Sequence, residues 1–357
     1  MNKVLYSLTL LLSILLGTAL IATHESSGTT GTLIVLNKSE SSATLISLKR
    51  GEALAAIPTG KGPHEVAVSP DGYTAVISNY GAQEPGSTLT VIDLRSQKVV
   101  KTIDLKKYQR PHGLVFLPDG ERLLVTAEAQ KALLIVDLDT GKVLEAIDTG
   151  QEVSHMVALV PKGKRAFVAN IRSGSVTVID LQKAKAVTTI KTGAGAEGID
   201  ISPDGREIWV SNRAEDRISI IDAESLKVVE TLECKSFPIR LKFTPNGQYV
   251  LVSNAQSGDV AVFDTHQHKE VRRIPMEVKA IEGKEIRLFS NRFGESPVPV
   301  GILIHPDGRH AYVANTNADL VTVIDLNTWK ITNRLKAGRE PDGLGFSPIE
   351  LDVQTGK

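Results

Sequence analysis

Three histidines stand at equivalent places in the chain, each at the start of a short apolar run that ends in a turn. They are His64 in GPHEVAVSPDG, His112 in RPHGLVFLPDG and His155 in VSHMVALVPKG. A neutral or apolar residue would serve as well at the start of such a run, so local structure does not explain these imidazoles. Imidazole nitrogen is a common ligand of zinc and other divalent transition metals, and this makes the position a candidate for metal chemistry.

Seven segments of the chain share this pattern, and the position of the histidines can be compared among them. In the order of the segments around a closed ring, it is occupied by Asp342, His64, His112, His155, Glu197, Ile239 and Val300. The residues two and four places further along each run are apolar and lie on the same side of a strand, so this side is expected to pack. Five ionisable groups beside a packed stripe must lie at its solvent-facing end or find partners.

We predict that these five groups converge at one mouth of a central channel and bind a divalent metal. Three imidazoles with one or two carboxylates suit Zn, Mn, Fe, Co, Ni or Cu, and a carboxylate could ligate the ion, orient an imidazole or act as a general base. The predicted metal ligands are His64, His112, His155, Glu197 and Asp342. A metal-free polar binding site and a purely structural role are the alternatives, because the equivalence comes from aligning the repeats and no linear ligand motif supports it.

The loops that follow the second strand of each segment are expected to open at the same mouth. Asparagine begins six of these seven loops, where it caps turns and tolerates a left-handed backbone. The third segment has Ala127 at this place and Glu128 after it, so Glu128 is a candidate to support His112. The predicted ligand-binding rim comprises Tyr80, Glu128, Arg172, Arg213 and Arg240. Its arginines suggest a ligand with a carboxylate or a phosphate, the alternative is a solvated loop face, and no catalytic residue is assigned.

An internal repeat supplies the elements that position these residues. A turn of the type SPDG recurs at intervals of 42 to 48 residues, with one longer interval of 61, at Pro70, Pro118, Pro161, Pro203, Pro245, Pro306 and Pro348. After the turns come β-branched runs that end in Asn, as in AYVAN, or in Asp, as in TVID, and then a third short run. Four short strands in a period of this length predict one blade of a propeller.

The predicted fold is all-β, a seven-bladed β-propeller of four-stranded blades over residues 32–348. The segment 32–60 supplies three strands of one blade and the segment 341–348 supplies the fourth, so the two ends of the chain close the ring and remove open sheet edges. The longer interval holds an insertion at 277–296, between blades 6 and 7. This insertion is expected to form either a wall or lid at the mouth or a loose surface hairpin.

The sequence also carries YVAN at 312–315, VSN at 210–212 and 252–254, and repeated copies of VTVIDL and SPDG. With these motifs, residues 32–348 resemble the YVTN-repeat β-propeller family, including its exported YncE-like members. The resemblance implies the seven-bladed fold and an exported protein, but family members often have no assigned role. Related seven-bladed propellers include lactonases and metal-dependent lyases, so the fold by itself does not assign an activity.

The N-terminus predicts a periplasmic or secreted protein. Residues 1–22 join an early lysine to an apolar run and fit a signal peptide, with an uncleaved membrane anchor as the alternative. Residues 23–31 are interpreted as a flexible lead-in and 349–357 as a C-terminal tail. Lys+Arg and Asp+Glu both total 41, so no basic patch indicates nucleic acid as a partner.

Two functions are compatible with these features. The first is binding of a ligand, in particular a divalent transition metal, at the channel mouth, with lyase or hydrolase activity left open. The second is a non-enzymatic scaffold for a protein or polysaccharide of the cell envelope. No nucleotide-binding fingerprint is present, so no nucleotide cofactor is indicated. We expect a monomer whose partner is a small molecule or an envelope protein or polysaccharide, with membrane contact only if the leader is retained.

Overall fold

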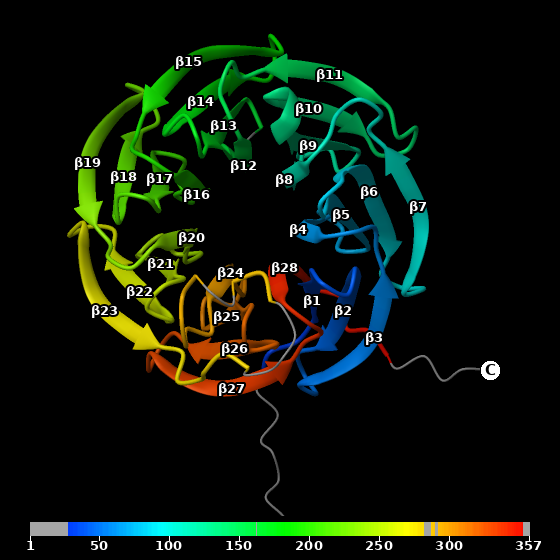
Figure 1. Ribbon diagram of the computed structural model, residues 1–357, viewed down its shortest axis with the longest axis vertical. Coiled ribbons are helices and arrows are strands. Elements are labelled where there is room, and N and C mark those ends of the chain that lie inside the picture. The colour runs from blue at the N-terminus through cyan, green and yellow to red at the C-terminus, as the bar shows by residue number, and fades with distance from the viewer. Residues whose placement is uncertain (1–27, 162, 282–286, 290–291, 353–357) are drawn as a thin grey trace, which may run out of the picture.

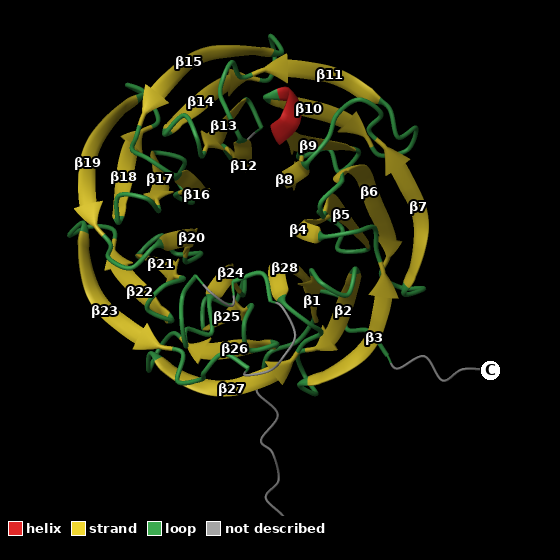
Figure 2. Ribbon diagram, in the orientation of Figure 1, coloured by secondary structure: helices red, strands yellow, loops and turns green. Residues whose placement is uncertain are grey.

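The computed structural model describes residues 28–161, 163–281, 287–289 and 292–352. The predicted leader, most of the lead-in, part of the insertion and the end of the tail lie outside the described residues. Within the described part of the chain, no helix is long and apolar enough to span a membrane. The helical content of this part is a single 3-10 turn, η1 (Glu128–Gln130), which Figure 2 shows beside β9 and β10.

In the described residues, seven antiparallel sheets of four strands form a ring, which confirms the predicted fold (Figure 1). We call the space enclosed by the innermost strands, which side chains partly fill, the channel. Blade 1 contains β28 (Pro341–Ser347), β1 (Thr32–Asn37), β2 (Ser42–Ser47) and β3 (Glu52–Pro58). Blades 2 to 4 contain β4 (Pro63–Val68), β5 (Thr74–Gly81), β6 (Pro85–Asp93), β7 (Lys98–Asp104); β8 (Pro111–Phe116), β9 (Arg122–Ala127), β10 (Ala132–Asp137), β11 (Val143–Asp148); and β12 (Ser154–Leu159), β13 (Arg165–Asn170), β14 (Ser175–Asp180), β15 (Lys185–Lys191). Blades 5 to 7 contain β16 (Ala196–Ile201), β17 (Glu207–Asn212), β18 (Arg217–Asp222), β19 (Lys227–Glu233); β20 (Pro238–Phe243), β21 (Tyr249–Asn254), β22 (Asp259–Asp264), β23 (Lys269–Pro275); and β24 (Pro299–Ile304), β25 (His310–Asn315), β26 (Leu320–Asp325), β27 (Lys330–Lys336).

The two ends of the described chain meet in blade 1. Strand β28 pairs antiparallel with β1, and the register places Thr32 opposite Ser347 and Val35 opposite Leu344. Figure 1 shows the red C-terminal strand as the innermost strand of this blade, beside the blue N-terminal strands. This closure completes the four strands of blade 1 from the two ends of the chain, as the repeat predicts.

The apolar core lies between the blades and not in the channel. The two middle strands of a blade are covered by neighbouring blades on both faces, so β13 and β14 are buried along most of their length. The outermost strand β15 is exposed at five consecutive positions. Between blades 5 and 6, Trp209 packs against Phe243 and Phe263 with ring centroids 5.8 and 6.1 Å apart. Seven such interfaces hold the inner strands rigidly around the channel.

A left-handed residue precedes every innermost strand. The φ angles of these seven residues lie between 55° and 79°, and the residues are Gly62, Arg110, Val153, Gly195, Phe237, Val298 and Glu340. A left-handed conformation costs about 1–2 kcal/mol for a residue with a Cβ atom, and most for a β-branched one. In five of the seven blades this residue has a Cβ atom, so its left-handed conformation is unfavourable by itself. It occurs because this bend turns the chain from the outer strand of one blade into the innermost strand of the next.

Hydroxyl groups of the second strands fix the backbone at the channel mouth. Thr126 Oγ1 donates to the backbone oxygen of His155 at 2.6 Å, and Ser253 Oγ donates to that of Val300 at 2.7 Å. In each case the hydroxyl belongs to one blade and the carbonyl to the first residues of the next blade's innermost strand. The side chains at the start of these innermost strands are therefore positioned by contacts from two blades.

Candidate functional site

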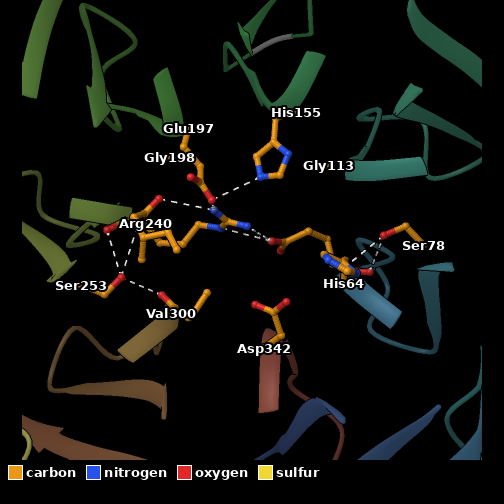
Figure 3. A network of polar contacts seen from close by, with 12 residues as sticks. His64, Ser78, Gly113, His155, Glu197, Gly198, Arg240, Ser253, Val300 and Asp342 are labelled. Atoms are coloured by element: carbon orange, nitrogen blue, oxygen red, sulfur yellow. Dashed lines mark hydrogen bonds and ion pairs between the residues drawn. The ribbon is translucent and has the colours of Figure 1, made fainter. Parts of the chain in front are cut away.

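The five ionisable residues at the strand starts all lie at one mouth of the channel and are all buried. The rings of His64 and His112 have centroids 4.9 Å apart, and those of His112 and His155 are 3.6 Å apart. His155 Nε2 lies 3.4 Å from Glu197 Oε1. Asp342 closes the arc from the other side and points into the channel, as Figure 3 shows together with His64, His155 and Glu197.

Glu128 joins this arc from the loop that follows β9. The 3-10 turn η1 takes the place of the Asn-led loops of the other blades, and it buries Glu128 beside the two neighbouring histidines. His155 Nδ1 donates to Glu128 Oε1, and Tyr80 Oη donates to Glu128 Oε2 at 2.6 Å. One ligand atom each of His112, Glu128 and His155 lies within 4.8 Å of the others, which is the spacing of a metal-binding group.

His112 is the most deeply buried of the three imidazoles, with 1% of its surface exposed. Its Nδ1 has no hydrogen-bond partner among the described residues. Burial, assisted by the nearby His155 and His64, holds the pKa of His112 well below its ordinary value. His112 is therefore neutral and offers a free nitrogen lone pair, which is the form of imidazole that binds metals.

His64 is also neutral. Its Nδ1 donates to the backbone oxygen of Gly62 at 2.9 Å, and its ring packs on Tyr80 with centroids 4.4 Å apart. Burial, together with the charge of Lys38, lowers the pKa of His64 to about 3. The structure thus places His64 beside the cluster of His112, Glu128 and His155, in contact with it through the rings of His112 and Tyr80.

His155 differs from the other two histidines because it lies between two carboxylates. Burial acts to lower the pKa of His155, but the charge and hydrogen bond of Glu128 and the contact with Glu197 outweigh it and raise the pKa. In the metal-free protein the imidazole therefore carries a proton shared with these carboxylates. A divalent ion that binds His155 must displace this proton.

A chain of charges crosses the channel behind the histidines. Arg240 Nη1 donates to Glu197 Oε1 at 2.8 Å, and on the other side Arg240 Nη2 donates to Glu65 Oε1 at 2.9 Å. Glu65 belongs to blade 2, Glu197 to blade 5 and Arg240 to blade 6, so the arginine links opposite sides of the ring. Figure 3 shows Arg240 together with Glu197. Burial opposes the charge of Arg240, but Glu65 and Glu197 outweigh it and raise the pKa of the guanidinium. We call the Glu65–Arg240–Glu197 contacts the channel strut.

Glu197 is held by three groups. Besides Arg240 and His155, Arg213 Nη1 contacts Glu197 Oε2. Burial acts to raise the pKa of Glu197, but the contact with His155 and the charges of Arg213 and Arg240 lower it. Glu197 is therefore an ionised carboxylate with a fixed position, directed at Nε2 of His155.

Asp342 has a partner of its own. Lys38 Nζ donates to Asp342 Oδ2 at 2.9 Å, while Asp342 Oδ1 has no hydrogen-bond partner among the described residues. Burial acts to raise the pKa of Asp342, but the charge of Lys38 lowers it. The ring closure explains this pair, because Lys38 follows β1 and Asp342 begins β28 of the same blade.

Four of the five predicted rim residues surround one hollow at the mouth. The hollow has a volume of about 420 Å³, opens to solvent, and is lined by Tyr80, Glu128, Val153, His155, Ile171, Arg172 and Arg213. It therefore includes two members of the cluster of His112, Glu128 and His155. The fifth predicted rim residue, Arg240, does not line the hollow and lies within the channel, with 8% of its surface exposed.

The described part of the insertion packs on the apolar sector of the mouth. Phe293 is buried in a cluster with Ile239 and Val300, and the ring of Phe237 lies 5.1 Å from that of Phe293. Residues 282–286 and 290–291 of the insertion lie outside the described residues. Its described residues thus form a wall where the strand starts are apolar, opposite the ionisable arc.

Sequence reasoning did not identify Glu65 and Lys38. A signal for Glu65 exists at the position after the strand start, which in the seven blades carries Glu65, Gly113, Met156, Gly198, Arg240, Gly301 and Gly343. Glycine is common here because the neighbouring backbone is close: a Cβ atom at Gly301 would lie 2.1 Å from the backbone oxygen of Asp342. The two charged exceptions, Glu65 and Arg240, have opposite signs and bind each other.

Fold and site together define a seven-bladed propeller with a cluster of ionisable groups at one channel mouth. Residues 119–241 match the family model of the cytochrome D1 heme domain, which is a family of seven-bladed β-propellers. Among solved structures, the chain is similar to hydrazine synthase of Kuenenia stuttgartiensis at 22% sequence identity and a TM-score of 0.66, covering 79% of this chain and 88% of that chain. No curated protein matches the sequence. The family-model match spans less than half of the chain, and the structural likeness at this identity shows the fold alone.

Proposed function

We propose that the protein binds one divalent transition metal at the channel mouth, through His112, Glu128 and His155. The observation that carries this proposal is the approach of three potential ligand atoms to within 4.8 Å, in a buried place where His112 Nδ1 has no hydrogen-bond partner within the described part of the chain. Two imidazoles and a carboxylate are a ligand set typical of zinc, and also suit Mn, Fe, Co, Ni and Cu.

The second contact of His155 supports the same proposal. His155 Nδ1 faces Glu128, so this nitrogen would share the ion with the carboxylate. The other nitrogen, Nε2, would then carry the proton and face Glu197 at 3.4 Å. Histidines that bind metals usually donate their second N–H to a carboxylate, which fixes the tautomer and the orientation of the ring.

A site with three protein ligands leaves room for a substrate on its open side. The hollow of about 420 Å³ borders Glu128 and His155, so the open side of the ion would face it. When bound, the ion would supply Lewis acidity toward a ligand in this hollow. Burial, with the charge of Glu128 beside it, raises the pKa of Tyr80, so Tyr80 keeps its proton and holds Glu128 in place. A metal-dependent lyase or hydrolase is the activity that these features favour.

A haem is the second candidate, and the match to the cytochrome D1 heme domain over 119–241 favours it. The residues present fit a single ion better. The hollow is lined by charged side chains such as Glu128, Arg172 and Arg213, and the channel strut crosses the space behind it. A haem requires a wide slot with apolar walls on both faces of the macrocycle, and the described residues of this mouth do not form one. An intense absorption band near 400 nm in the purified protein would identify a haem.

The proposed setting is the periplasm or the cell exterior. The leader, the resemblance to exported YVTN-repeat propellers and the ring fold support this setting. A scaffold for an envelope protein or polysaccharide is the alternative function, because propeller faces present large surfaces. The two functions differ in one outcome: a scaffold would keep its partner when His112 is replaced by alanine, and a metal-dependent enzyme would lose its activity.

Metal analysis of the full chain, expressed without a histidine tag, tests the proposal. After incubation with zinc and removal of free ion, we expect about one equivalent of zinc per chain, and loss of that zinc in His112→Ala and His155→Ala. The control is His268→Ala, because His268 on the outer surface also contacts two carboxylates, Glu207 and Glu230. Less than about a tenth of an equivalent in the wild type, with Zn, Mn, Fe and Cu each tried, would reject the metal site.

A further inference from the structure

The hollow beside the cluster of His112, Glu128 and His155 has an apolar side and a cationic side. Val153 and Ile171 are half-buried and form the apolar part of its lining. Arg172 and Arg213 form the cationic part, and Glu128 and His155 form the floor. Two guanidinium groups, the side chains of Glu128 and His155, and an aliphatic wall around one space define the chemistry of the ligand that fits it.

Arg213 is held in position but keeps donors free. Its Nη1 contacts Glu197, and its guanidinium lies over the ring of Phe237 at 5.3 Å from the ring centroid. A quarter of its side chain remains exposed, and its other nitrogens have no partner among the described residues. An arginine stacked in this way is already ordered, so less entropy is lost when it binds an anion.

Arg172 is the more exposed of the two cations. Its side chain is 74% exposed, and its contact is with Glu152 at 3.7 Å. An exposed pair at this distance contributes little and is readily exchanged for a ligand. Glu128, the anionic residue of the hollow, is already engaged by Tyr80 and His155 and does not neutralise either arginine.

We infer that the hollow binds a small organic acid, with its carboxylate between Arg172 and Arg213 and its hydrocarbon part against Val153 and Ile171. This inference rests on the proposed function, because the same ligand would lie beside the ion. A carboxylate fits better than a phosphate, because Glu197 partly neutralises Arg213 and Glu152 partly neutralises Arg172. The positive charge that remains on the two arginines matches the single negative charge of a carboxylate. A volume of about 420 Å³ is at the small end of ligand pockets.

Calorimetric titration of the zinc-loaded full chain tests this inference, with phenylacetate as the probe. We expect phenylacetate to bind and its neutral analogue phenylacetamide to bind at least about 10-fold more weakly. Arg172→Gln should weaken phenylacetate about 10-fold or more while the zinc content is unchanged. Arg213→Gln should weaken phenylacetate to a similar extent in protein saturated with zinc, which is required because Arg213 also contacts Glu197. The control is Arg206→Gln, because Arg206 is exposed at the turn beyond the other end of β16 and its partner there is Asp204.

Several results would overturn the inference. They are no phenylacetate binding to the zinc-loaded wild type, equal binding in the Arg172→Gln/Arg213→Gln double variant, and tighter binding of inorganic phosphate than of phenylacetate. If zinc does not bind the wild type, the proposed function fails, and the metal-free protein is titrated instead. Binding there that depends on the two arginines still supports the carboxylate site, and its absence rejects the site as well.

Discussion

Replacement of Arg240 by methionine removes the centre of the channel strut. Methionine keeps much of the side-chain volume and carries no charge. The arginine donates to Glu65 at 2.9 and 3.2 Å and to Glu197 at 2.8 Å, and all three side chains are largely buried. In Arg240→Met, Glu197 keeps Arg213 and His155, but the Glu65 carboxylate has no other salt bridge among the described residues.

The expected loss has two parts. Removing one partner from a buried ion pair costs about 3–5 kcal/mol, so the free energy of unfolding of the metal-free protein should fall by that amount. Outer contacts of a metal-binding histidine are worth about 10–100-fold in metal affinity, so zinc should bind about 10–100-fold more weakly while its stoichiometry stays the same. Arg240 acts here through Glu197 and His155, and Glu197→Gln should weaken zinc binding to a similar extent.

Urea unfolding of the metal-free protein and competition with a chromophoric zinc chelator measure these two effects. In the Arg240→Met/Glu65→Gln double variant, at least about 2 kcal/mol of stability should return, because the buried carboxylate of Glu65 is removed too. Arg206→Met is the matched control, since its ion pair with Asp204 is exposed, and it should change neither quantity. A zinc affinity within about twofold of the wild type in Arg240→Met, alongside the loss of stability, would refute the coupling of the strut to the metal site.

Three further outcomes are expected. The pKa of His64 is about 3 in the folded protein, against about 6.5 in an unfolded chain, so its contribution to stability is complete above about pH 6.5 and is lost as the pH falls. Between pH 7 and 5 this loss is about 2 kcal/mol in the metal-free protein, and urea unfolding of His64→Asn should show a correspondingly smaller decline. Gly301→Ala places a Cβ atom 2.1 Å from the backbone oxygen of Asp342 and should lower the unfolding free energy by about 1–3 kcal/mol; an unchanged value would contradict the packing. Val153 has a φ of 59°, which asparagine tolerates better than valine, so Val153→Asn should raise the melting temperature, and a lower one would refute the strain.

The fold was predictable because its signal is repeated. The turn before the second strand and the Asp-ended third strand recur in blades 2 to 7, and the buried asparagine after the second strand recurs in every blade except blade 3. The asparagines have equivalent roles in the structure: Asn79 donates to Thr90, Asn212 to Ser219 and Asn315 to Thr322, all across the hairpin and all buried. A local pattern that recurs six times can be recognised in one sequence even when no single copy is conclusive.

The arc of ionisable groups was predictable for a related reason. The alternation of side chains along a strand shows which side of an innermost strand packs against its neighbours. A charged residue on that side must therefore lie at the end of the strand. The comparison among blades then separates His64, His112 and His155 from Ile239 and Val300, which are apolar like the rest of the packed side. Glu128 could be singled out because blade 3 lacks the asparagine that every other blade has, and in the structure it lies within the cluster.

The contacts across the channel could not be predicted in the same way. Glu65 and Arg240 are separated by 175 positions and belong to blades that are not neighbours. Their pairing depends on the diameter of the channel and on the reach of an arginine side chain, which no periodic pattern encodes. Lys38 illustrates the same limit, because its contact with Asp342 exists only when the two ends of the chain share a blade.

The charge balance of the mouth follows from these contacts. Each buried carboxylate of the arc has a cationic or proton-donating partner: Glu65 and Glu197 have Arg240, Asp342 has Lys38, and Glu128 has Tyr80 and His155. The histidines that have no carboxylate partner, His64 and His112, are neutral. His155 is the one imidazole of the arc whose proton an incoming ion would replace, and the buried nitrogen of His112 is the ligand that needs no such exchange.

Anomalous X-ray scattering from a zinc-loaded crystal of the full chain tests the central claim most directly. The metal site predicts one strong peak at the zinc edge, bounded by a ring nitrogen of His112, a ring nitrogen of His155 and the carboxylate of Glu128, at zinc–ligand distances of about 2.0–2.2 Å. A peak held by His64 and Asp342, a peak only at the surface, or no peak at this mouth would contradict it.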